Sequence, residues 1–230
     1  MAHIPDGVLA APVLVTGALV STVLVALALR RLDYERLPQA AVLSAAFFVA
    51  SLIQVPAGPS SVHLLLNGLM GLLLGWTAVP AILVALILQA VFFGYGGVLV
   101  LGVNTLNMAV PALVCALALT APLRANGRLA QSERGRLARS SGLTSVLGRT
   151  PEGRAFWVGA LAGLLGVALT GALVALSLAA SGAAFQAAAW VILAAYVPLA
   201  LVEALVTGTV VAFLQRVEPG LLPQAETTGD

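Results

Sequence analysis

The sequence predicts an all-α protein, a polytopic transmembrane helix bundle of about seven helices. Composition is the first reason: of 230 residues, 60% are hydrophobic and 9% are charged, whereas a soluble domain carries roughly 25% charged residues. The mean hydropathy of +1.05 agrees. The third reason is that several uncharged stretches exceed the ~18 residues that indicate a membrane-spanning helix.

The apolar stretches divide into seven expected spans. The first ends clearly at Arg30-Arg31. The third and fourth are short, near the lower limit of about 17 residues, so they either cross with little tilt or form a re-entrant pair. The seven spans are residues 8–29, 38–55, 61–76, 78–93, 102–121, 155–180 and 187–214.

The arginines give the bundle an orientation. All basic residues are arginines, and they follow the first span, separate the fifth from the sixth, and follow the seventh. With seven spans these three places share one side, which the positive-inside rule makes cytoplasmic. We therefore expect the N-terminus outside and the C-terminus in the cytoplasm. No secretory signal is expected, because the positive charge follows the first apolar stretch instead of preceding it.

We expect one domain, residues 1–218, followed by a disordered tail at 219–230. Residues 123–153 are rich in Arg, Gly and Ser, so they are expected to form a flexible basic loop in the cytoplasm. That loop either only sets the topology or contacts anionic membrane lipid or a cytoplasmic partner. Nucleic acid is not an expected partner. The single cysteine, Cys115, lies in an apolar run and is expected to be a small buried hydrophobe.

The N-terminal peptide, residues 1–7 (MAHIPDG), has the composition of a metal chelate. If Met1 is removed, the amine of Ala2, the His3 amide nitrogen and the His3 ring can bind one ion in fused rings. Sets of four nitrogens in a plane suit Ni(II) and Cu(II), and Co(II) less specifically. If Met1 is retained, its amine, two amides and the same imidazole also form a planar set, without a need for His63.

His63 is the only other histidine, and it is expected at the outer start of the third span, on the same side as His3. On a helix it would share a face with Asn67 and Met70. A lone histidine at a membrane helix end is often only an interfacial residue. The presence of His3 on the same side favours a metal ligand.

Few other polar residues fall near or within the spans. Asp6 either caps the first span or accepts a hydrogen bond from an imidazole. Asn104 and Asn107 lie near the outer start of the fifth span. Glu203 is the only carboxylate inside a span. Because ionisable groups in a membrane usually face the bundle interior or a cavity, Glu203 is either functional or a structural hydrogen-bond partner.

Taken together, these residues resemble the CbiM/NikM family, the substrate-capture membrane subunits (S components) of energy-coupling-factor transporters for cobalt and nickel. The matching motifs are HIPDG at 3–7, SVH at 61–63 with Gly68 after it, NTLNM at 104–108 and PLALVE at 198–203. They extend over nearly the whole chain. Two departures are the extra residue Ala2, since the family usually begins Met-His, and Tyr196, where many relatives are expected to have histidine.

The resemblance implies a multi-pass protein of the prokaryotic cell membrane that is not an enzyme, holds no cofactor and transports Ni(II) or Co(II). A neighbouring corrin-synthesis cluster would indicate cobalt, and urease or hydrogenase genes would indicate nickel. The implied ligands are Ala2 (or Met1, if it is retained), His3 and His63, with Asp6, Asn67, Asn104, Asn107 and Glu203 around them. The implied partners are a transmembrane coupling subunit, two ABC ATPase subunits and a possible small accessory membrane subunit, because the sequence contains no P-loop.

Two other classes remain open. A transport subunit for a different small substrate, such as a vitamin, would not need a histidine beside the N-terminus. An intramembrane metalloprotease would require His-Glu-x-x-His, which the sequence lacks. Ser60 and Ser61 beside His63 are a weak basis for a serine hydrolase.

Overall fold

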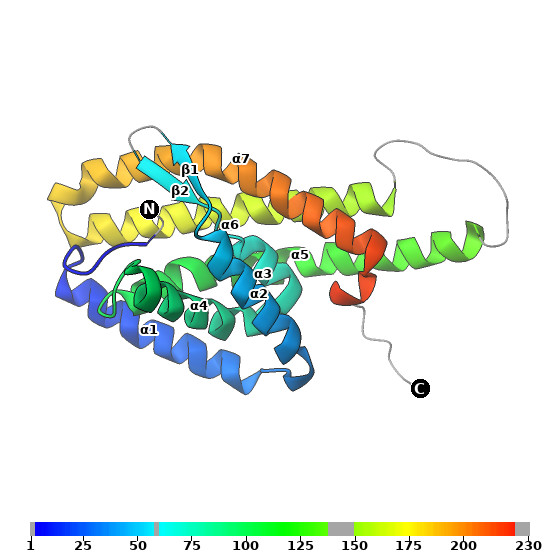
Figure 1. Ribbon diagram of the computed structural model, residues 1–230, viewed down its shortest axis with the longest axis horizontal. Helices are drawn as coiled ribbons and strands as arrows, with labels where there is room; N and C mark the ends of the chain where they lie inside the picture. The colour runs from blue at the N-terminus through cyan, green and yellow to red at the C-terminus, as the bar shows by residue number, and fades with distance from the viewer. Residues whose placement is uncertain (1–2, 58–59, 138–149, 224–230) are drawn as a thin grey trace.

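The computed structural model describes residues 3–57, 60–137 and 150–223 as a helix bundle with one short β-hairpin (Figure 1). The expectation of a helical transmembrane protein is confirmed, and the hairpin is the exception to it. The elements are α1 (Ala11–Arg30), α2 (Leu37–Ala50), β1 (Gln54–Ala57), β2 (Ser60–His63), α3 (Asn67–Leu74), α4 (Ala78–Phe93), α5 (Leu101–Leu137), α6 (Pro151–Ser181) and α7 (Gln186–Val217).

Five helical stretches of the described residues are long and apolar enough to cross a membrane, so the expected count of seven spans is not supported. Helix α2 has 14 residues, about 21 Å of helix, against a hydrocarbon core of about 30 Å. Helices α3 and α4 together form one stretch, interrupted at Gly75, where φ is +56°. The five are Ala11–Arg30, Asn67–Phe93, Leu101–Ala130, Pro151–Ser181 and Ala183–Val217.

The β-hairpin replaces the start of the expected third span. Strand β2 pairs antiparallel with β1, with Gln54 opposite His63, and α3 begins only at Asn67. The prediction that His63, Asn67 and Met70 share a helix face was therefore wrong. Pro56 lies within β1 and has no amide N–H to donate, a property that suits the edge of a sheet and not a helix interior.

The expected loop at 123–153 is partly helical. Helix α5 continues to Leu137, and Figure 1 shows it extending beyond the rest of the bundle alongside the start of α6. Asn126 joins the two helices: its Nδ2 donates to the Pro151 carbonyl at 2.7 Å, and its Oδ1 accepts from Arg154 Nε at 2.9 Å. The prediction of a flexible loop was wrong for 123–137, and residues 138–149 lie outside the described residues.

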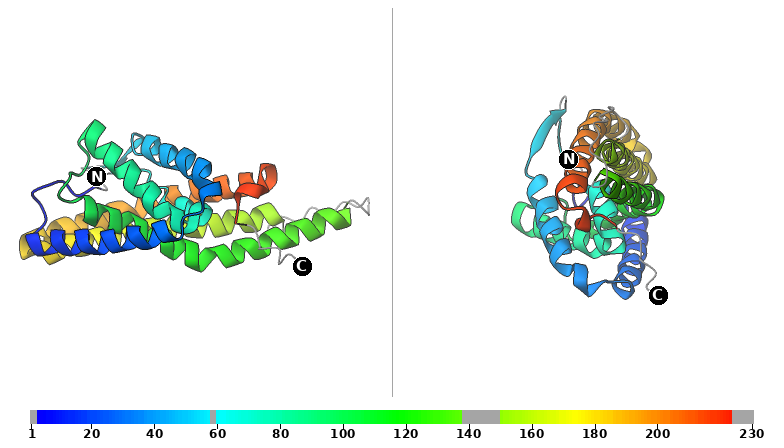
Figure 2. Two further views of the ribbon diagram at one scale, coloured as in Figure 1. Left: turned by 90° about the horizontal axis from the view of Figure 1, so that it is seen from below. Right: turned by 90° about the vertical axis from the view of Figure 1, so that its right-hand side faces the viewer.

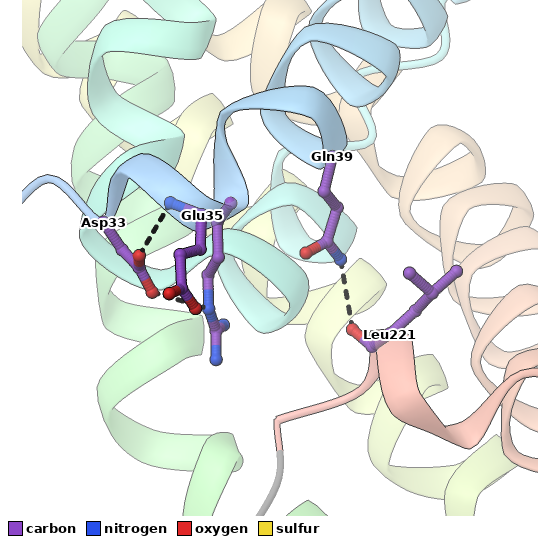
Figure 3. A network of polar contacts seen from close by, with 5 residues as sticks. Asp33, Glu35, Gln39 and Leu221 are labelled. Atoms are coloured by element: carbon purple, nitrogen blue, oxygen red, sulfur yellow. Dashed lines mark hydrogen bonds and ion pairs between the residues drawn. The ribbon is translucent and has the colours of Figure 1, made fainter.

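The beginning of the expected tail is also ordered. Pro219–Leu221 form a 3-10 turn, and Gln39 Nε2 of α2 donates to the Leu221 carbonyl at 3.1 Å (Figure 3). Beside this contact, Asp33 accepts from the Glu35 amide at 3.0 Å and pairs with Arg36 at 3.3 Å. Disorder from 219 onward was therefore wrong for these first residues, and 224–230 lie outside the described part.

Small residues allow the helices to approach closely. A Cβ at Gly71 of α3 would overlap the Ala112 carbonyl of α5, and one at Gly163 of α6 would overlap the Glu203 carbonyl of α7. Close backbone contact of this kind is typical of membrane helices, where small residues form the interfaces. It places α7, and Glu203 with it, against the centre of the bundle.

Candidate metal-binding site

The structure brings the two histidines together. His3 lies in the segment ahead of α1, and His63 is the last residue of β2. Both side chains are buried, each 4% exposed, and their rings are nearly parallel with centroids 5.0 Å apart. Two imidazoles bound side by side to one ion, at metal–nitrogen distances of about 2.0 Å, have centroids roughly 4.5 Å apart. The pair is therefore within reach of a shared ion.

The ring nitrogens of this pair are largely without hydrogen bonds. Among the residues that the structure describes, neither nitrogen of His3 has a hydrogen-bond partner, and neither does Nε2 of His63. Nδ1 of His63 lies 3.0 Å from the Leu64 carbonyl, so it carries the proton and leaves a lone pair on Nε2. Because buried polar atoms in proteins are nearly always partnered, three unpartnered imidazole nitrogens in one place indicate a ligand-binding site.

Burial also keeps both rings neutral. Burial, reinforced by the neighbouring His63, lowers the pKa of His3 from 6.5 to about 3. Burial lowers the pKa of His63 as well, against an opposing hydrogen bond to Leu64. Metal ions bind the neutral form of imidazole. At neutral pH neither ring has to lose a proton before it binds an ion.

Asn104 and Asp6 hold the N-terminal segment in the bundle. Asn104 Oδ1 accepts from the Ile4 amide at 3.2 Å, and its Nδ2 donates to the Ile4 carbonyl at 3.1 Å. Asp6 accepts from the Val100 amide at 3.0 Å, just ahead of α5. Asp6 thus satisfies a free amide at the start of α5, where a helix attracts negative charge, instead of capping the first span or accepting from an imidazole.

Glu203 and Asn67 hold the chain that follows His63. The Glu203 carboxylate accepts from the amides of Leu65 and Leu66, the latter at 3.0 Å. Leu66 has φ +49°, a left-handed conformation that is rare outside glycine. Asn67 Nδ2 donates to Thr170 Oγ1 of α6 at 2.7 Å. Their partners are backbone and hydroxyl groups, so both residues support the strand end that carries His63.

The remaining predicted residues fall into two groups. Asn107 is buried and accepts from Ser177 Oγ at 3.4 Å, while its Nδ2 has no partner in the described part of the chain. Met1 and Ala2 lie outside the described residues. Within the described residues no group of three or more His, Cys, Asp or Glu side chains is arranged to hold a metal. A metal at the histidine pair therefore requires backbone or N-terminal nitrogens as well.

Sequence reasoning missed the loop between α4 and α5. Tyr95 in this loop lies parallel to His3, with ring centroids 6.1 Å apart and an interplanar angle of 15°. The signal was present in the sequence, because three glycines within residues 94–97 are typical of a sharp turn. Tyr95 itself carries no signal without the fold.

A cavity of about 310 Å³ between α1, α4 and α5 has a different character. Two hydroxyls that line it, those of Ser21 and Thr22, both donate to the Ala18 carbonyl of their own helix. A third, that of Thr105, donates to the Leu101 carbonyl. The cavity therefore presents mainly hydrocarbon to a ligand, unlike the histidine pair.

Fold and site together define a helical membrane protein whose two buried histidines form a candidate metal-binding site. The chain belongs to the CbiM family: the family described as "Cobalt uptake substrate-specific transmembrane region" matches residues 3–221. It is thus a cobalt or nickel transport component of the membrane, which confirms the family resemblance drawn from the sequence motifs.

The individual relatives agree with this assignment. A metal transport protein of Haemophilus influenzae is 37% identical over 225 residues, covering 97% of this chain and 98% of the relative. A fused nickel transport protein, NikMN, of Rhodobacter capsulatus is 43% identical over 115 residues, which are 47% of this chain and 33% of that protein. The crystal structure of a transition metal transporter has the same fold, with a TM-score of 0.67, 24% identity and 94% of each chain covered.

Proposed function

We propose that this chain is the substrate-capture subunit of an energy-coupling-factor importer, and that it binds Ni(II) or Co(II) at the outer face of a prokaryotic cell membrane. The ligands are the N-terminal amine (of Ala2 after loss of Met1), the amide and ring of His3, and His63. The ion is the transported substrate.

The observation that carries this proposal is the pair of buried, neutral imidazoles, three of whose four ring nitrogens have no hydrogen-bond partner among the described residues. Asn104 strengthens it, because this side chain engages both backbone groups of Ile4 and fixes the peptide immediately after His3. The Ile4 amide is thereby unavailable to a metal, which leaves the His3 amide as the nearest backbone nitrogen. An amine, an amide and two imidazoles form the four-nitrogen set that planar Ni(II) prefers.

The distribution of helix ends supports the proposed orientation. In Figures 1 and 2 (left), the N-terminal segment and the hairpin lie toward one end of the long axis. The C-terminal ends of α5 and α7 and the start of α6, which carry arginines, lie toward the other end, and the C-terminal end of α1 lies nearer the middle. Five crossings, like seven, put the two termini on opposite sides. The positive-inside rule then assigns the arginine end to the cytoplasm and the histidine pair to the outside.

The proposed partners follow from the energy requirement. The sequence has no P-loop, so ATP hydrolysis falls to partner ATPases joined through a transmembrane coupling subunit, with a possible small accessory subunit. We assign contacts with cytoplasmic partners to one surface, the end of α5 and the start of α6, which extend together at the arginine end.

The test is metal titration combined with intact mass. The purified full chain is weighed with and without metal, and Ni(II) and Co(II) are titrated into wild type, His3→Ala and a variant with one residue inserted before Ala2. Loss of Met1, one ion per chain and loss of binding in both variants are expected. Gln39→Ala, which changes a contact at the arginine end, is the matched control and should bind normally. Unchanged binding in His3→Ala would refute the proposal.

A further inference from the structure

The loop between α4 and α5 packs directly on the N-terminal segment. It contains Gly94, Gly96 and Gly97, all with positive φ, at +65°, +79° and +158°. A Cβ at Gly96 would come within 2.9 Å of Asn104 Nδ2, and a Cβ at Gly97 would overlap the Asp6 carboxylate. Since Asn104 and Asp6 hold the segment that carries His3, the loop has no room to move toward it or to carry side chains at these two glycines.

Tyr95, between these glycines, belongs to a row of rings that ends at the histidines. The row runs from His63 to His3, then to Tyr95, Phe93 and Phe48. Phe93 lies 5.7 Å from Tyr95, and Phe48 of α2 lies 5.3 Å from Phe93, measured between centroids. Each ring limits the rotation of the next. Tyr95 therefore neighbours Phe93 of α4 as well as His3, and Phe93 in turn neighbours Phe48 of α2.

We propose that Tyr95 is a positioning residue, which lies parallel to the His3 ring and fixes the plane of that imidazole for planar metal binding. The inference rests on the proposed function. When one histidine binds an ion through its amide and its ring, the ring has to turn close to the plane of the nitrogens. A ring that is already held in its bound orientation loses less rotational freedom on binding, so affinity rises.

The same contact favours one metal over another. If Tyr95 holds the imidazole near the plane of the four nitrogens, its effect is largest for an ion that needs a planar set of ligands. Ni(II) and Cu(II) accept a square-planar set, whereas Co(II) is less suited to it. Loss of the Tyr95 ring should consequently weaken Ni(II) binding more than Co(II) binding.

The experiment compares Tyr95→Leu with Tyr95→Phe in the full chain. Three quantities are measured: the Ni(II) and Co(II) affinities, the d–d absorption band of the Ni(II) complex, and the proton chemical shifts of the His3 ring without metal. We expect Tyr95→Phe to match wild type within about twofold. Tyr95→Leu should lose roughly 2- to 10-fold in Ni(II) affinity, the range of an aromatic pair, with a smaller loss for Co(II), a changed d–d band and loss of the ring-current shift at His3.

Two results would overturn the inference while leaving the proposed function intact. In the first, Tyr95→Leu binds Ni(II) with the affinity and spectrum of wild type, although His3→Ala has lost binding. In the second, Tyr95→Phe fails as badly as Tyr95→Leu, which would assign the role to the hydroxyl group. Absence of Ni(II) and Co(II) binding in wild type is the distinct signature of a failed function, and the inference would fail with it.

Discussion

The histidine pair and the Glu203 region are both buried and polar, but their hydrogen bonds differ. The Glu203 carboxylate engages two backbone amides, and Asn67 engages a hydroxyl group of α6. At the histidine pair, three of the four ring nitrogens make no hydrogen bond to any residue that the structure describes. Since an unpartnered buried polar group costs free energy, a fold keeps one where another requirement overrides stability. This difference in hydrogen bonding separates residues that support the pocket from residues whose polar atoms are free to bind a ligand.

The hydrogen bonds of Glu203 also indicate why a carboxylate lies inside the bundle. An ionisable residue within a membrane is a functional candidate by default. Here the described hydrogen bonds of Glu203 all go to the turn after His63, including Leu66 in its left-handed conformation. We infer that Glu203 acts on the metal through the position of β2. Mutations at the histidine pair should therefore mainly lower metal affinity, and mutations at Glu203 should mainly lower the stability of the metal-free protein.

The largest expected effect is on metal affinity at the histidine pair. His3→Ala should weaken Ni(II) binding by more than about 100-fold, because partners of metal ligands alone contribute 10- to 100-fold and a ligand contributes more. The thermal midpoint of the metal-free protein should fall less than in Glu203→Ala, because packing of the buried ring is lost but no hydrogen bond to a described residue. Calorimetric titration and thermal unfolding in detergent measure the two quantities. A large loss of metal-free stability would show that the His3 ring supports the fold, as Glu203 does.

Glu203→Ala should show the reverse pattern. Removal of the carboxylate leaves the buried amides of Leu65 and Leu66 without an acceptor, at a cost of about 2–3 kcal/mol in the free energy of unfolding. Denaturant unfolding of the metal-free protein measures this loss. Glu203→Gln is the control, because it keeps one acceptor oxygen and should lose less. If Glu203→Ala unfolds like wild type but fails to bind metal, Glu203 belongs to the metal site itself.

Sequence reasoning found these regions for different reasons. The helices and the two histidines follow from local properties: hydropathy marks α1, α5, α6 and α7, and charge marks their ends. The hairpin does not, because β2 is stabilised by pairing with β1 and by the turn that Glu203 holds from α7. Composition reports neither contact. For the same reason, the proximity of Tyr95 to His3 was invisible, although its glycine neighbours already indicated a turn.

Asn104 is expected to fall between the two extremes. Asn104→Leu keeps the volume of the side chain but removes both hydrogen bonds to Ile4, so the N-terminal peptide is no longer fixed behind His3. We expect metal affinity to fall about 10- to 100-fold, the usual effect of losing a residue that orients a ligand. The release of bound Ni(II), followed by the absorption of the complex, should become faster. An unchanged release rate would show that the contact of Asp6 with Val100 is enough to hold the peptide.

The smallest expected effect is a dependence of the free energy of unfolding on pH, which comes from the histidine pair. The pKa of His3 is lowered to about 3, and that of His63 is lowered too, so the unfolded chain binds more protons below pH 6.5 than the folded chain does. The stability of the metal-free protein should thus be complete above pH 6.5 and decline as pH falls from there toward 3. For each imidazole, one pH unit below 6.5 removes at most about 1.4 kcal/mol.

The variants divide this slope between the residues. Denaturant unfolding at pH 6.5 and 5.5 should give a smaller difference for His3→Ala than for wild type, because that variant has lost one of the two neutral imidazoles. Gln39→Ala should keep the wild-type slope, since its contact to Leu221 involves no titrating group. Equal slopes in wild type and His3→Ala would mean that the His3 ring reaches water in solution. In that case water would satisfy the ring nitrogens of His3, and they would give no reason to expect a bound metal ion. His3 and Glu203 would then no longer differ in whether their polar atoms have partners.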